Sequence, residues 1–310
     1  GFVGRQPEDL RSRIEERIVE HQRLVEIFHK QDQDIVPGLV VDEDYELIAE
    51  LGAGATAVVW EARQLSLDRR VAIKFLRLPL ALLSDRAQER FHREGRILAG
   101  IRHPGLVSVH SLGTHGMVPY LVEELVEASQ SLHEVILSLH EERQVGAVAE
   151  ERHERHDRRV AAWILDIARA LAVVHAKGIL HRDVKPANIL VGGDDRARII
   201  DFGLAYMDDP HELTLSGEML GTVLYMSPEQ AGGGISDAVD VRSDLFSLGV
   251  SLYEALTFES PFREDSHARI LEKIRTFDPP DPRTIRSRVP EELAAIVGQM
   301  IEKRPERRYQ

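Results

Sequence analysis

The first hydrophobic pattern along the chain has the spacing of an amphipathic helix. Between residues 8 and 30, apolar residues recur at helical intervals with Glu and Arg between them: Leu10, Ile14, Ile18, Val25 and Phe28. Pro37 and Gly38 then stop the pattern. Two interpretations of this helix are open. Its apolar stripe docks on the domain that follows, or it pairs with another chain.

The pattern then changes to short apolar runs that are typical of β-strands. The predicted strands cover residues 45–51, 57–63, 70–76, 106–112 and 119–125. A helical pattern interrupts them over about residues 84–99, and helical patterns dominate from Leu132 onward, as over 160–176 and 243–257.

A strand-rich part followed by a helix-rich part predicts an α+β fold of two lobes. We expect a helical extension and linker over residues 1–42 and a smaller, strand-rich lobe with one helix over 43–125. A larger helical lobe follows over 126–310, in which the last helix is cut short.

Residues 140–159 form a charged block (HEERQVGAVAEERHERHDRR) between two helical patterns. Charge runs of this kind usually form a solvated face, so we expect a solvent-exposed insertion, whether or not it is helical. The alternative, a metal site built on the His153–His156 spacing, has only the two histidines in its favour.

Composition narrows the class of protein. Of the 310 residues, 43% are hydrophobic and 29% are charged, which excludes a wholly disordered, collagen-like or rod-like chain. The formal net charge of −13 argues against non-specific binding of nucleic acid or of an anionic membrane. No apolar run reaches the ~18 residues of a membrane helix.

The chain has no cysteine, which excludes disulfides, thiolate metal sites and cysteine nucleophiles and fits a reducing compartment. We therefore expect a cytoplasmic location. No signal peptide opens the chain. Because the chain begins with Gly1 rather than Met, we also expect a fragment. It is then open whether this is the cytoplasmic domain of a longer, membrane-anchored protein.

The first segment with candidate chemistry is a glycine-bearing hairpin. Gly52 and Gly54 stand between two predicted strands, where the lack of a Cβ lets the backbone lie close over phosphates. A dinucleotide fold would need a helix after the glycines, whereas a strand follows here. A plain turn is the alternative for this segment taken alone.

The second segment is the strand Val71-Ala72-Ile73-Lys74. A lysine that points inward from an apolar strand needs a counter-charge, because a buried unpaired ammonium costs several kcal/mol. Glu94, close to the apolar face of the predicted helix, is the expected partner. A surface lysine is the alternative.

The third segment runs from His181 to Leu190 (HRDVKPANIL) and is followed by Asp201 at the end of the next strand. Carboxylate and amide oxygens suit Mg²⁺, which prefers hard oxygen ligands and substrate phosphates. Asp183 would accept a proton from a hydroxyl, and Lys185 would neutralise charge on a phosphoryl group in transfer.

Together these motifs resemble the protein kinase superfamily, and most closely the bacterial serine/threonine kinases of eukaryotic type. The glycine loop, VAIK, the helix glutamate, HRDVKPAN, DFG and GTVLYMSPE stand in the order of that family over about residues 44–310. The resemblance implies a bilobal kinase fold, ATP and Mg²⁺ (or Mn²⁺) as cofactors, and protein substrates that carry serine or threonine. Lys185 and Thr222, which would position the substrate, resemble the serine/threonine class.

By resemblance, Lys74, Glu94, Asp183 and Lys185 are the catalytic residues, and Asn188 and Asp201 hold the metal. The residues expected around ATP are Leu51, Gly52, Ala53, Gly54, Ala55, Thr56, Ala57, Val59, Ala72, Lys74, Glu124, Val126, Asn188, Leu190 and Asp201. Leu98, Val109, His181 and Phe202 are expected to stack as an internal spine.

Two further contacts are implied by the resemblance. Asp244 would tie down the catalytic loop, and Glu229 would pair with a late arginine, for which we expect Arg307. Between DFG and SPE, Thr214 and Ser216 resemble activation phosphosites, and a phosphate there would be held by Arg182. The alternative is that both are exposed hydroxyls with no role.

The chain departs from the family pattern at three positions. Ala57 replaces the third glycine of the loop, Ser227 replaces the alanine of APE, and Glu123 stands where an apolar residue usually precedes the hinge. A carboxylate at this position needs a partner or a raised pKa.

Three functions are compared. The intact set of Lys74, Glu94, Asp183, Asn188 and Asp201 favours an active protein kinase. A nucleotide-binding pseudokinase that acts as a scaffold is the alternative, and a small-molecule phosphotransferase is disfavoured by the peptide-docking segment. A homodimer through the N-terminal helix or the lobes is a further expectation.

Overall fold

The computed structural model describes residues 35–54, 57–76, 85–144, 150–202, 223–232 and 239–310. Its strands are β1 (Val40–Val41), β2 (Tyr45–Ala53), β3 (Ala57–Gln64), β4 (Arg69–Leu76), β5 (Val109–His115), β6 (Val118–Glu124), β7 (Gln130–Ser131), β8 (Ile189–Val191) and β9 (Ala197–Ile199). Its helices are α2 (Asp85–Ala99), α3 (Leu132–Gln144), α4 (Glu150–His175), α6 (Pro228–Ala231), α7 (Val241–Thr257), α8 (His267–Thr276), α9 (Pro282–Ile285) and α10 (Glu291–Met300), with 3-10 turns η2 (Pro186–Asn188) and η5 (Pro305–Arg307).

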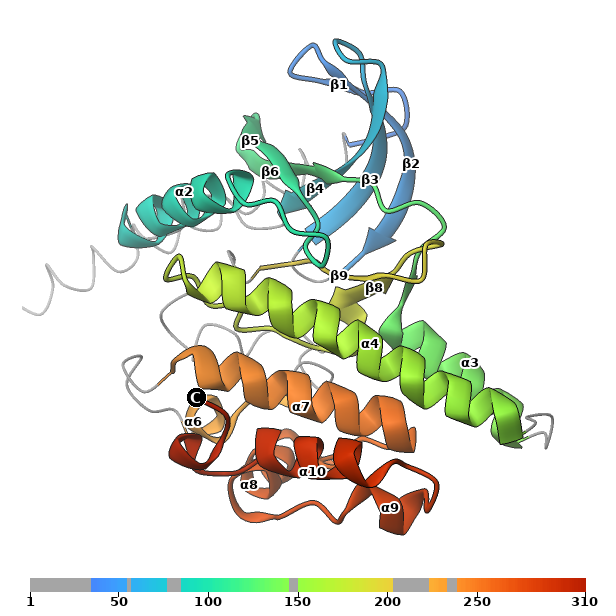
Figure 1. The fold of residues 1–310 in the computed structure, drawn as a ribbon. Coiled ribbons are helices and arrows are strands. Elements are labelled where there is room, and N and C mark those ends of the chain that lie inside the picture. The colour runs from blue at the N-terminus through green and yellow to red at the C-terminus, as the bar shows by residue number, and fades with distance from the viewer. Residues whose placement is uncertain (1–34, 55–56, 77–84, 145–149, 203–222, 233–238) are drawn as a thin grey trace, which may run out of the picture. The chain divides into compact units, whose positions relative to one another are not determined.

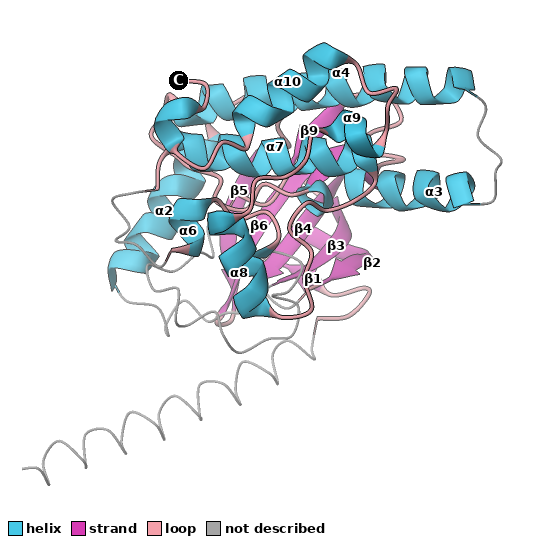
Figure 2. Cartoon of the chain, turned by 90° about the horizontal axis from the view of Figure 1, so that it is seen from below, coloured by secondary structure: helices cyan, strands magenta, loops and turns pink. Residues whose placement is uncertain are grey.

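The chain forms two compact units, which confirms the predicted α+β class (Figures 1 and 2). The first unit takes in the described residues up to Ala99 together with Val109–Leu125, and it holds most of the strands. The second unit takes in Gly100–Ser108 and Val126–Gln310, and it holds most of the helices.

The first unit is built on a six-stranded sheet in the order β1-β2-β3-β4-β6-β5. Successive side chains of a strand point to opposite faces, and residues directly opposite on neighbouring strands share a face. The core face is formed by apolar residues of alternating positions: Val58, Trp60, Ala62, Val71, Ile73, Phe75, Val118, Tyr120 and Val122. The other face carries both apolar and charged residues at the intervening positions, such as Ala72, Lys74 and Leu76 of β4.

Helix α2 packs against strand β5 through a close contact. Gly95 is buried, and a Cβ built there would lie 2.3 Å from Cδ2 of Leu112. Glycine at this position therefore lets the helix lie close to the sheet, one residue after Glu94.

The second unit is organised around α7, which packs between α4 and α10 (Figure 1). Most of its residues are buried, as expected for a helix that is apolar on nearly all sides. Asp240 caps the N-terminus by accepting a hydrogen bond from the Arg242 N–H at 2.8 Å. A small sheet in the order β7-β8-β9 belongs to the same unit.

Two predicted elements differ from the structure. The strand predicted over residues 106–112 begins later, as β5 at Val109, because Leu106 and Val107 pair instead with Ile199 of the second unit. The helix predicted from Val160 begins at Glu150, so the charged block contributes its first turns.

The expectation that residues 140–159 form a solvated face is wrong for two residues of that block. His156 and Asp157 are 5% and 3% exposed. The imidazole Nε2 of His156 lies 2.9 Å from the carbonyl of Ala255, and the His156 ring stacks on Phe258. The last carbonyls of a helix have no partner within it, and His156 satisfies one of those of α7.

Asp157 has a different partner near the same helix end. Its two carboxylate oxygens each accept a hydrogen bond at 3.0 Å from Nη2 of Arg286, which is also buried. Arg286 in turn donates to the carbonyl of Leu256 and lies over the ring of Phe258. A cation at a helix C-terminus is also favoured by the helix dipole.

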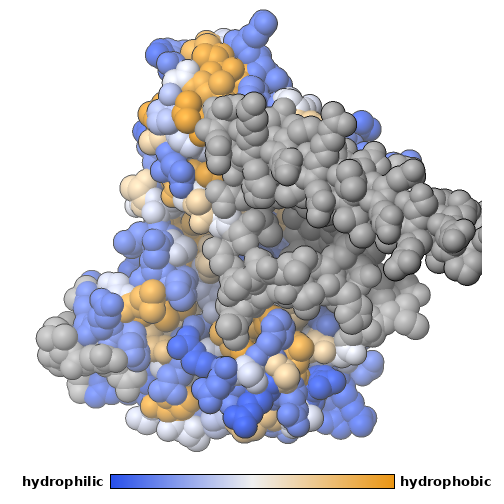
Figure 3. All heavy atoms as spheres, turned by 180° about the vertical axis from the view of Figure 1, so that it is seen from behind, coloured by the Kyte–Doolittle hydropathy of each residue, from blue (hydrophilic) through white to orange (hydrophobic). Residues whose placement is uncertain are grey.

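In Figure 3, hydrophilic residues predominate over the visible face, with hydrophobic residues in small groups between them. Among the described residues, none of the helices has the length and apolar character required to span a membrane. The same part of the chain contains no cluster of three or more His, Cys, Asp or Glu side chains suited to a metal ion.

The Asp157–Arg286 pair is predicted to be a large contributor to stability. Arg286→Met removes the guanidinium whose Nη2 donates to both oxygens of a buried carboxylate and should lower the free energy of unfolding by about 3–5 kcal/mol, measured by urea denaturation. The exposed pair of Arg63 and Asp68 supplies the control, because Arg63→Met there should cost less than about 1 kcal/mol. Equal effects of the two substitutions would contradict this assignment, and Asp157→Asn combined with Arg286→Met should recover most of the loss.

Candidate active site

The glycine hairpin forms as predicted, between two paired strands. Gly52 pairs with Val59 and Ala53 with Val58 across β2 and β3. The N–H of Gly54 donates to the carbonyl of Ala57 at 2.8 Å, which closes the hairpin. Among the described residues, apart from its chain neighbours, no atom lies within 4 Å of a Cβ built on Gly52, so their packing does not require glycine there. Ala55 and Thr56 lie outside the described residues.

The sheet face opposite the apolar core carries the other predicted residues of this unit. Lys74 is opposite Val59 on one side and Leu121 on the other, and Ala72 is opposite Glu123. These residues therefore share one face. The residues on either side of Lys74 in β4, Ile73 and Phe75, are fully buried in the core. The opposite face of this strand carries Lys74 between the apolar residues Ala72 and Leu76.

Glu94 is half-buried in α2, and its carboxylate Oε1 lies 3.9 Å from Nη2 of Arg93. The pairing of Glu94 with Lys74 stays a prediction. Leu51, at the start of the hairpin, is 50% exposed, so this apolar residue is outside the core and available to a ligand.

In the second unit, the structure brings three of the predicted site residues together. Nζ of Lys185 lies 2.8 Å from Oδ2 of Asp183. The amide Nδ2 of Asn188 donates to the same Oδ2 at 3.0 Å and to the carbonyl of Asp183 at 2.8 Å. This arrangement fixes the orientation of the Asn188 amide, because its nitrogen is used by Asp183 and its oxygen is directed elsewhere.

Asp201 follows strand β9 and is tied to the same loop. The N–H of Ile200 donates to the carbonyl of Asn188 at 2.9 Å, and Asp201 comes directly after it. Arg182 and Asp201 have φ angles of +66° and +62°, in the left-handed region that favours glycine. Such strain persists only where the surroundings hold the backbone in place, and it is concentrated at functional sites.

Asp244 of α7 holds the catalytic loop by its backbone. Its Oδ2 accepts from the N–H of His181 at 2.8 Å, and its Oδ1 accepts from the N–H of Arg182 at 2.7 Å. Nε2 of His175 also lies 2.7 Å from Oδ2. Asp244 was predicted from the sequence, but His175 was not, because a periodic pattern cannot distinguish it from any other polar residue at a helix end.

His181 is completely buried and its two ring nitrogens have different partners. Nδ1 accepts a hydrogen bond from the N–H of Asp183 at 3.3 Å, and Nε2 lies 2.9 Å from the carbonyl of Ile200. These partners fit the neutral ring with its proton on Nε2. Burial lowers the pKa of His181 and so favours the same form. The ring also contacts that of Phe202, with centroids 4.6 Å apart.

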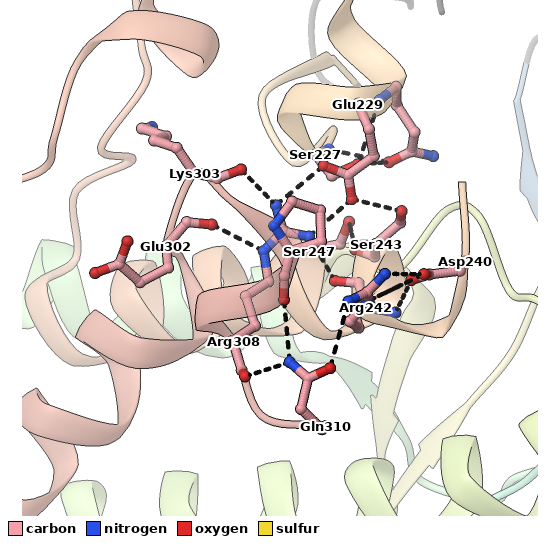
Figure 4. A network of polar contacts seen from close by, with 12 residues as sticks. Ser227, Glu229, Asp240, Arg242, Ser243, Ser247, Glu302, Lys303, Arg308 and Gln310 are labelled. Atoms are coloured by element: carbon pink, nitrogen blue, oxygen red, sulfur yellow. Dashed lines mark hydrogen bonds and ion pairs between the residues drawn. The ribbon is translucent and has the colours of Figure 1, made fainter. Parts of the chain in front are cut away.

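The expected partner of Glu229 was wrong by one residue. Nη1 and Nη2 of Arg308 lie 2.7 and 3.0 Å from the two carboxylate oxygens of Glu229, whereas Arg307 is exposed (Figure 4). The 3-10 turn η5 causes this difference, because it exposes Arg307 and buries the residue after it.

The carboxylate of Glu229 remains charged despite its burial. Burial by itself raises the pKa of Glu229, but the hydrogen bonds from Arg308 and from Oγ of Ser243 outweigh it and lower the pKa below its usual range. Arg308 also donates to the carbonyls of Arg242, Glu302 and Lys303, so its buried guanidinium is well satisfied.

The remaining predicted residues are distributed as follows. The boundary between the two units falls between Glu124 and Val126, and Leu190 is half-buried in β8. Glu123 is half-buried in β6, on the face described above. Thr214, Ser216 and Thr222 lie outside the described residues.

The donor set of the second unit fits a hard divalent cation. Asn188 directs its amide nitrogen at Asp183, so its oxygen is not used in these two bonds. If a cation binds here, that oxygen and the Asp201 carboxylate would be its protein ligands. Two protein oxygens are enough for Mg²⁺, which keeps waters and substrate phosphates as its other ligands. A Mg²⁺ site of this kind does not need all of its ligands to come from the protein.

Comparison with known proteins identifies related chains. The sequence model of a protein family, the protein kinase domain, matches residues 45–310. The serine/threonine-protein kinase PknB of Mycolicibacterium smegmatis is 37% identical over 276 residues, which cover 87% of this chain and 41% of that protein. A probable serine/threonine-protein kinase of Streptomyces coelicolor, SCO3848, is 36% identical over 86% of this chain and 38% of that protein.

The chain thus spans about two fifths of the length of these curated relatives. Among solved structures, the kinase domain of PknI from Mycobacterium tuberculosis superposes with a TM-score of 0.64 at 22% identity, over 89% of this chain and 94% of that one. This similarity confirms the predicted fold.

The environment of His181 predicts a pH dependence of stability. Because burial lowers its pKa below the ordinary 6.5, the unfolded chain takes up the proton first as the pH falls. The free energy of unfolding should therefore decrease below about pH 6.5, by at most about 1.4 kcal/mol per pH unit from this residue. Urea denaturation between pH 7.5 and pH 5.5 would measure it.

His181→Gln should lose this part of the slope, and His92→Gln, at an exposed position of α2, should keep it. The same slope in the His181 variant and in the unchanged protein would rule out His181 as the source.

Proposed function

This chain belongs to the protein kinase family, and from that premise we propose that it transfers the γ-phosphate of ATP to serine and threonine hydroxyls of proteins. The observation that carries the proposal is the contact of the Asp183 carboxylate with Lys185 and Asn188, at 2.8 and 3.0 Å. A carboxylate, a cation and an amide on one short loop are the groups that phosphoryl transfer to a hydroxyl requires.

In the proposed reaction, Asp183 orients the substrate hydroxyl and accepts its proton. The hydroxyl oxygen forms a bond to the γ-phosphorus, the bond to the bridging oxygen breaks, and ADP leaves. Both contacts of Asp183 with Lys185 and Asn188 use Oδ2, which leaves Oδ1 for the proton. Lys185 carries the positive charge that balances the transferred group.

Mg²⁺, or Mn²⁺ in its place, would be held by the oxygens of Asn188 and Asp201 and would supply charge neutralisation to the phosphates. The strained backbone of Asp201 and the hydrogen bond from Ile200 to Asn188 support this assignment, since they fix where the two side chains begin.

In the first unit, we assign the phosphate contacts to the hairpin from Leu51 to Ala57, with Lys74 on the α- and β-phosphates and Glu94 as its partner. The base would lie against Val59 and Ala72 of this unit. Glu124 and Val126 would supply backbone groups to the edge of the base. The shared sheet face of Val59, Ala72 and Lys74 supports the assignment.

We also propose a cytoplasmic location, in keeping with the cysteine-free composition. The second partner proposal, beside the protein substrates, is a homodimer through the lobes or through the helix expected over residues 8–30, which lie outside the described residues.

The first test is Asp183→Asn. Incubation with Mg-ATP and a generic protein substrate should give phosphate transfer in the unchanged protein and a loss of at least about 10²-fold in the variant, because the near-isosteric amide accepts no proton. Asp265→Asn, at an exposed position, should remain active.

The other outcomes distinguish the alternatives. ATP binding without turnover in the unchanged protein would favour the pseudokinase scaffold, and transfer only to small molecules would favour a small-molecule phosphotransferase.

The second test concerns Thr214 and Ser216, which we propose as autophosphorylation sites. Within the described part of the chain no carboxylate pairs with the guanidinium of Arg182, so a phosphate on this segment would gain charge-assisted hydrogen bonds there. Mass spectrometry should find phosphate on both residues in the active protein and on neither in Asp183→Asn. Replacing both with alanine should lower activity severalfold, whereas Ser138→Ala, at an exposed position of α3, should not.

A further inference from the structure

The side-chain amide of Gln230 has two separate roles, one for its oxygen and one for its nitrogen. Its Oε1 accepts from the N–H of Ser227 at 3.0 Å and from Oγ of Ser227 at 3.1 Å, which completes a capping box at the start of α6. Its Nε2 instead donates to the carbonyl of Arg182 at 3.2 Å, in the catalytic loop. Only the first role is expected from the Ser-x-x-Gln spacing.

The carbonyl that Gln230 binds belongs to the peptide that leads into Asp183. Arg182 is in the left-handed region, with φ +66°, so its conformation must be held by its surroundings. Asp244 holds the N–H of Arg182, and His181 accepts from the N–H of Asp183 at 3.3 Å. The Arg182–Asp183 peptide is thus fixed at its N–H by His181 and at its oxygen by Gln230.

The segment that carries Gln230 is itself firmly attached to α7 and to the C-terminal turn. The hydroxyl of Tyr225 donates to Oε2 of Glu254 at 2.5 Å in a buried position, and Glu229 pairs with Arg308. The neighbouring Ser227 is fully buried. The backbone of Gln230 is therefore held in place by its neighbours. Its side-chain amide can then hold the Arg182 carbonyl in one position.

We propose that Gln230 is a positioning residue, which sets the orientation of the Asp183 carboxylate through the Arg182–Asp183 peptide. This inference rests on the proposed function, since it assigns Gln230 a part in the same reaction. The inference predicts that the hydrogen bond donated by Nε2 affects turnover, independently of the capping box, which uses Oε1. Misplacement of a reacting group by about 1 Å can cost about 10²-fold in rate.

The sharpest test is Gln230→Glu, because glutamate serves equally well in a capping box but its carboxylate cannot donate to the Arg182 carbonyl. We expect kcat to fall about tenfold, with KM for ATP within about twofold of the unchanged protein and a melting temperature lowered less than in Gln230→Met, because only one hydrogen bond is lost. Gln230→Met, which removes both roles, should lower kcat and the melting temperature together. Gln299→Glu, an exposed position on α10, controls for the added charge.

A second measurement is independent of activity. Amide hydrogen exchange in the segment 181–184 should be faster in Gln230→Glu than in Gln299→Glu, because the peptide has lost one of its two anchors. If kcat and exchange in Gln230→Glu match those of the unchanged protein, the inference is wrong and the cap is the only role of Gln230.

Absence of transfer in the unchanged protein would instead count against the proposed function. In that event exchange alone decides whether Gln230 holds the peptide, and unchanged exchange would still overturn the inference.

Discussion

The second unit depends on one buried carboxylate, that of Asp244, and on the two backbone N–H groups that it holds. A single side chain near the start of α7 accepts from successive residues of the catalytic loop, His181 and Arg182, and also lies against His175. A buried carboxylate is costly unless it is well hydrogen-bonded. The loop that supplies these donors is therefore held to the helix, because Asp244 without them would be a buried carboxylate with too few hydrogen bonds.

This constraint explains how backbone strain is maintained next to the candidate base. Arg182 would relax to a more favourable conformation if its N–H were free, but that group is held by the carboxylate. The neutral ring of His181 then accepts from the next N–H and contacts Ile200. The position of Asp183 is thus determined by hydrogen bonds to the backbone of residues 181–183 and does not depend on the contacts of its own side chain.

The helix that carries Asp244 must itself be fixed, and an arginine–carboxylate pair is found near each of its ends. Arg308 binds Glu229 and the carbonyl of Arg242 near the N-terminus (Figure 4). Arg286 binds Asp157 and the carbonyl of Leu256 at the C-terminus. Both arginines are buried, and both also satisfy helix or loop carbonyls, which is how a buried ion pair compensates for its loss of water.

Much of the fold and the local chemistry followed from the sequence alone. Alternating apolar residues predicted β2, β3, β4 and β6 closely, because a strand with one buried face must alternate. The order of short motifs, from the hairpin at Gly52 to the loop at Asp183, identified the family, because each motif places its functional groups through local backbone geometry.

What the sequence did not determine were contacts between residues far apart in the chain. His156 and Asp157 read as solvated members of a charged block, and only the packing of α4 against the end of α7 buries them. Likewise a choice between Arg307 and Arg308 depends on the rotation of one 3-10 turn. Hydrophobic periodicity and motif spacing encode which face of an element is buried. The partner of a buried polar group is decided only when tertiary packing removes it from water.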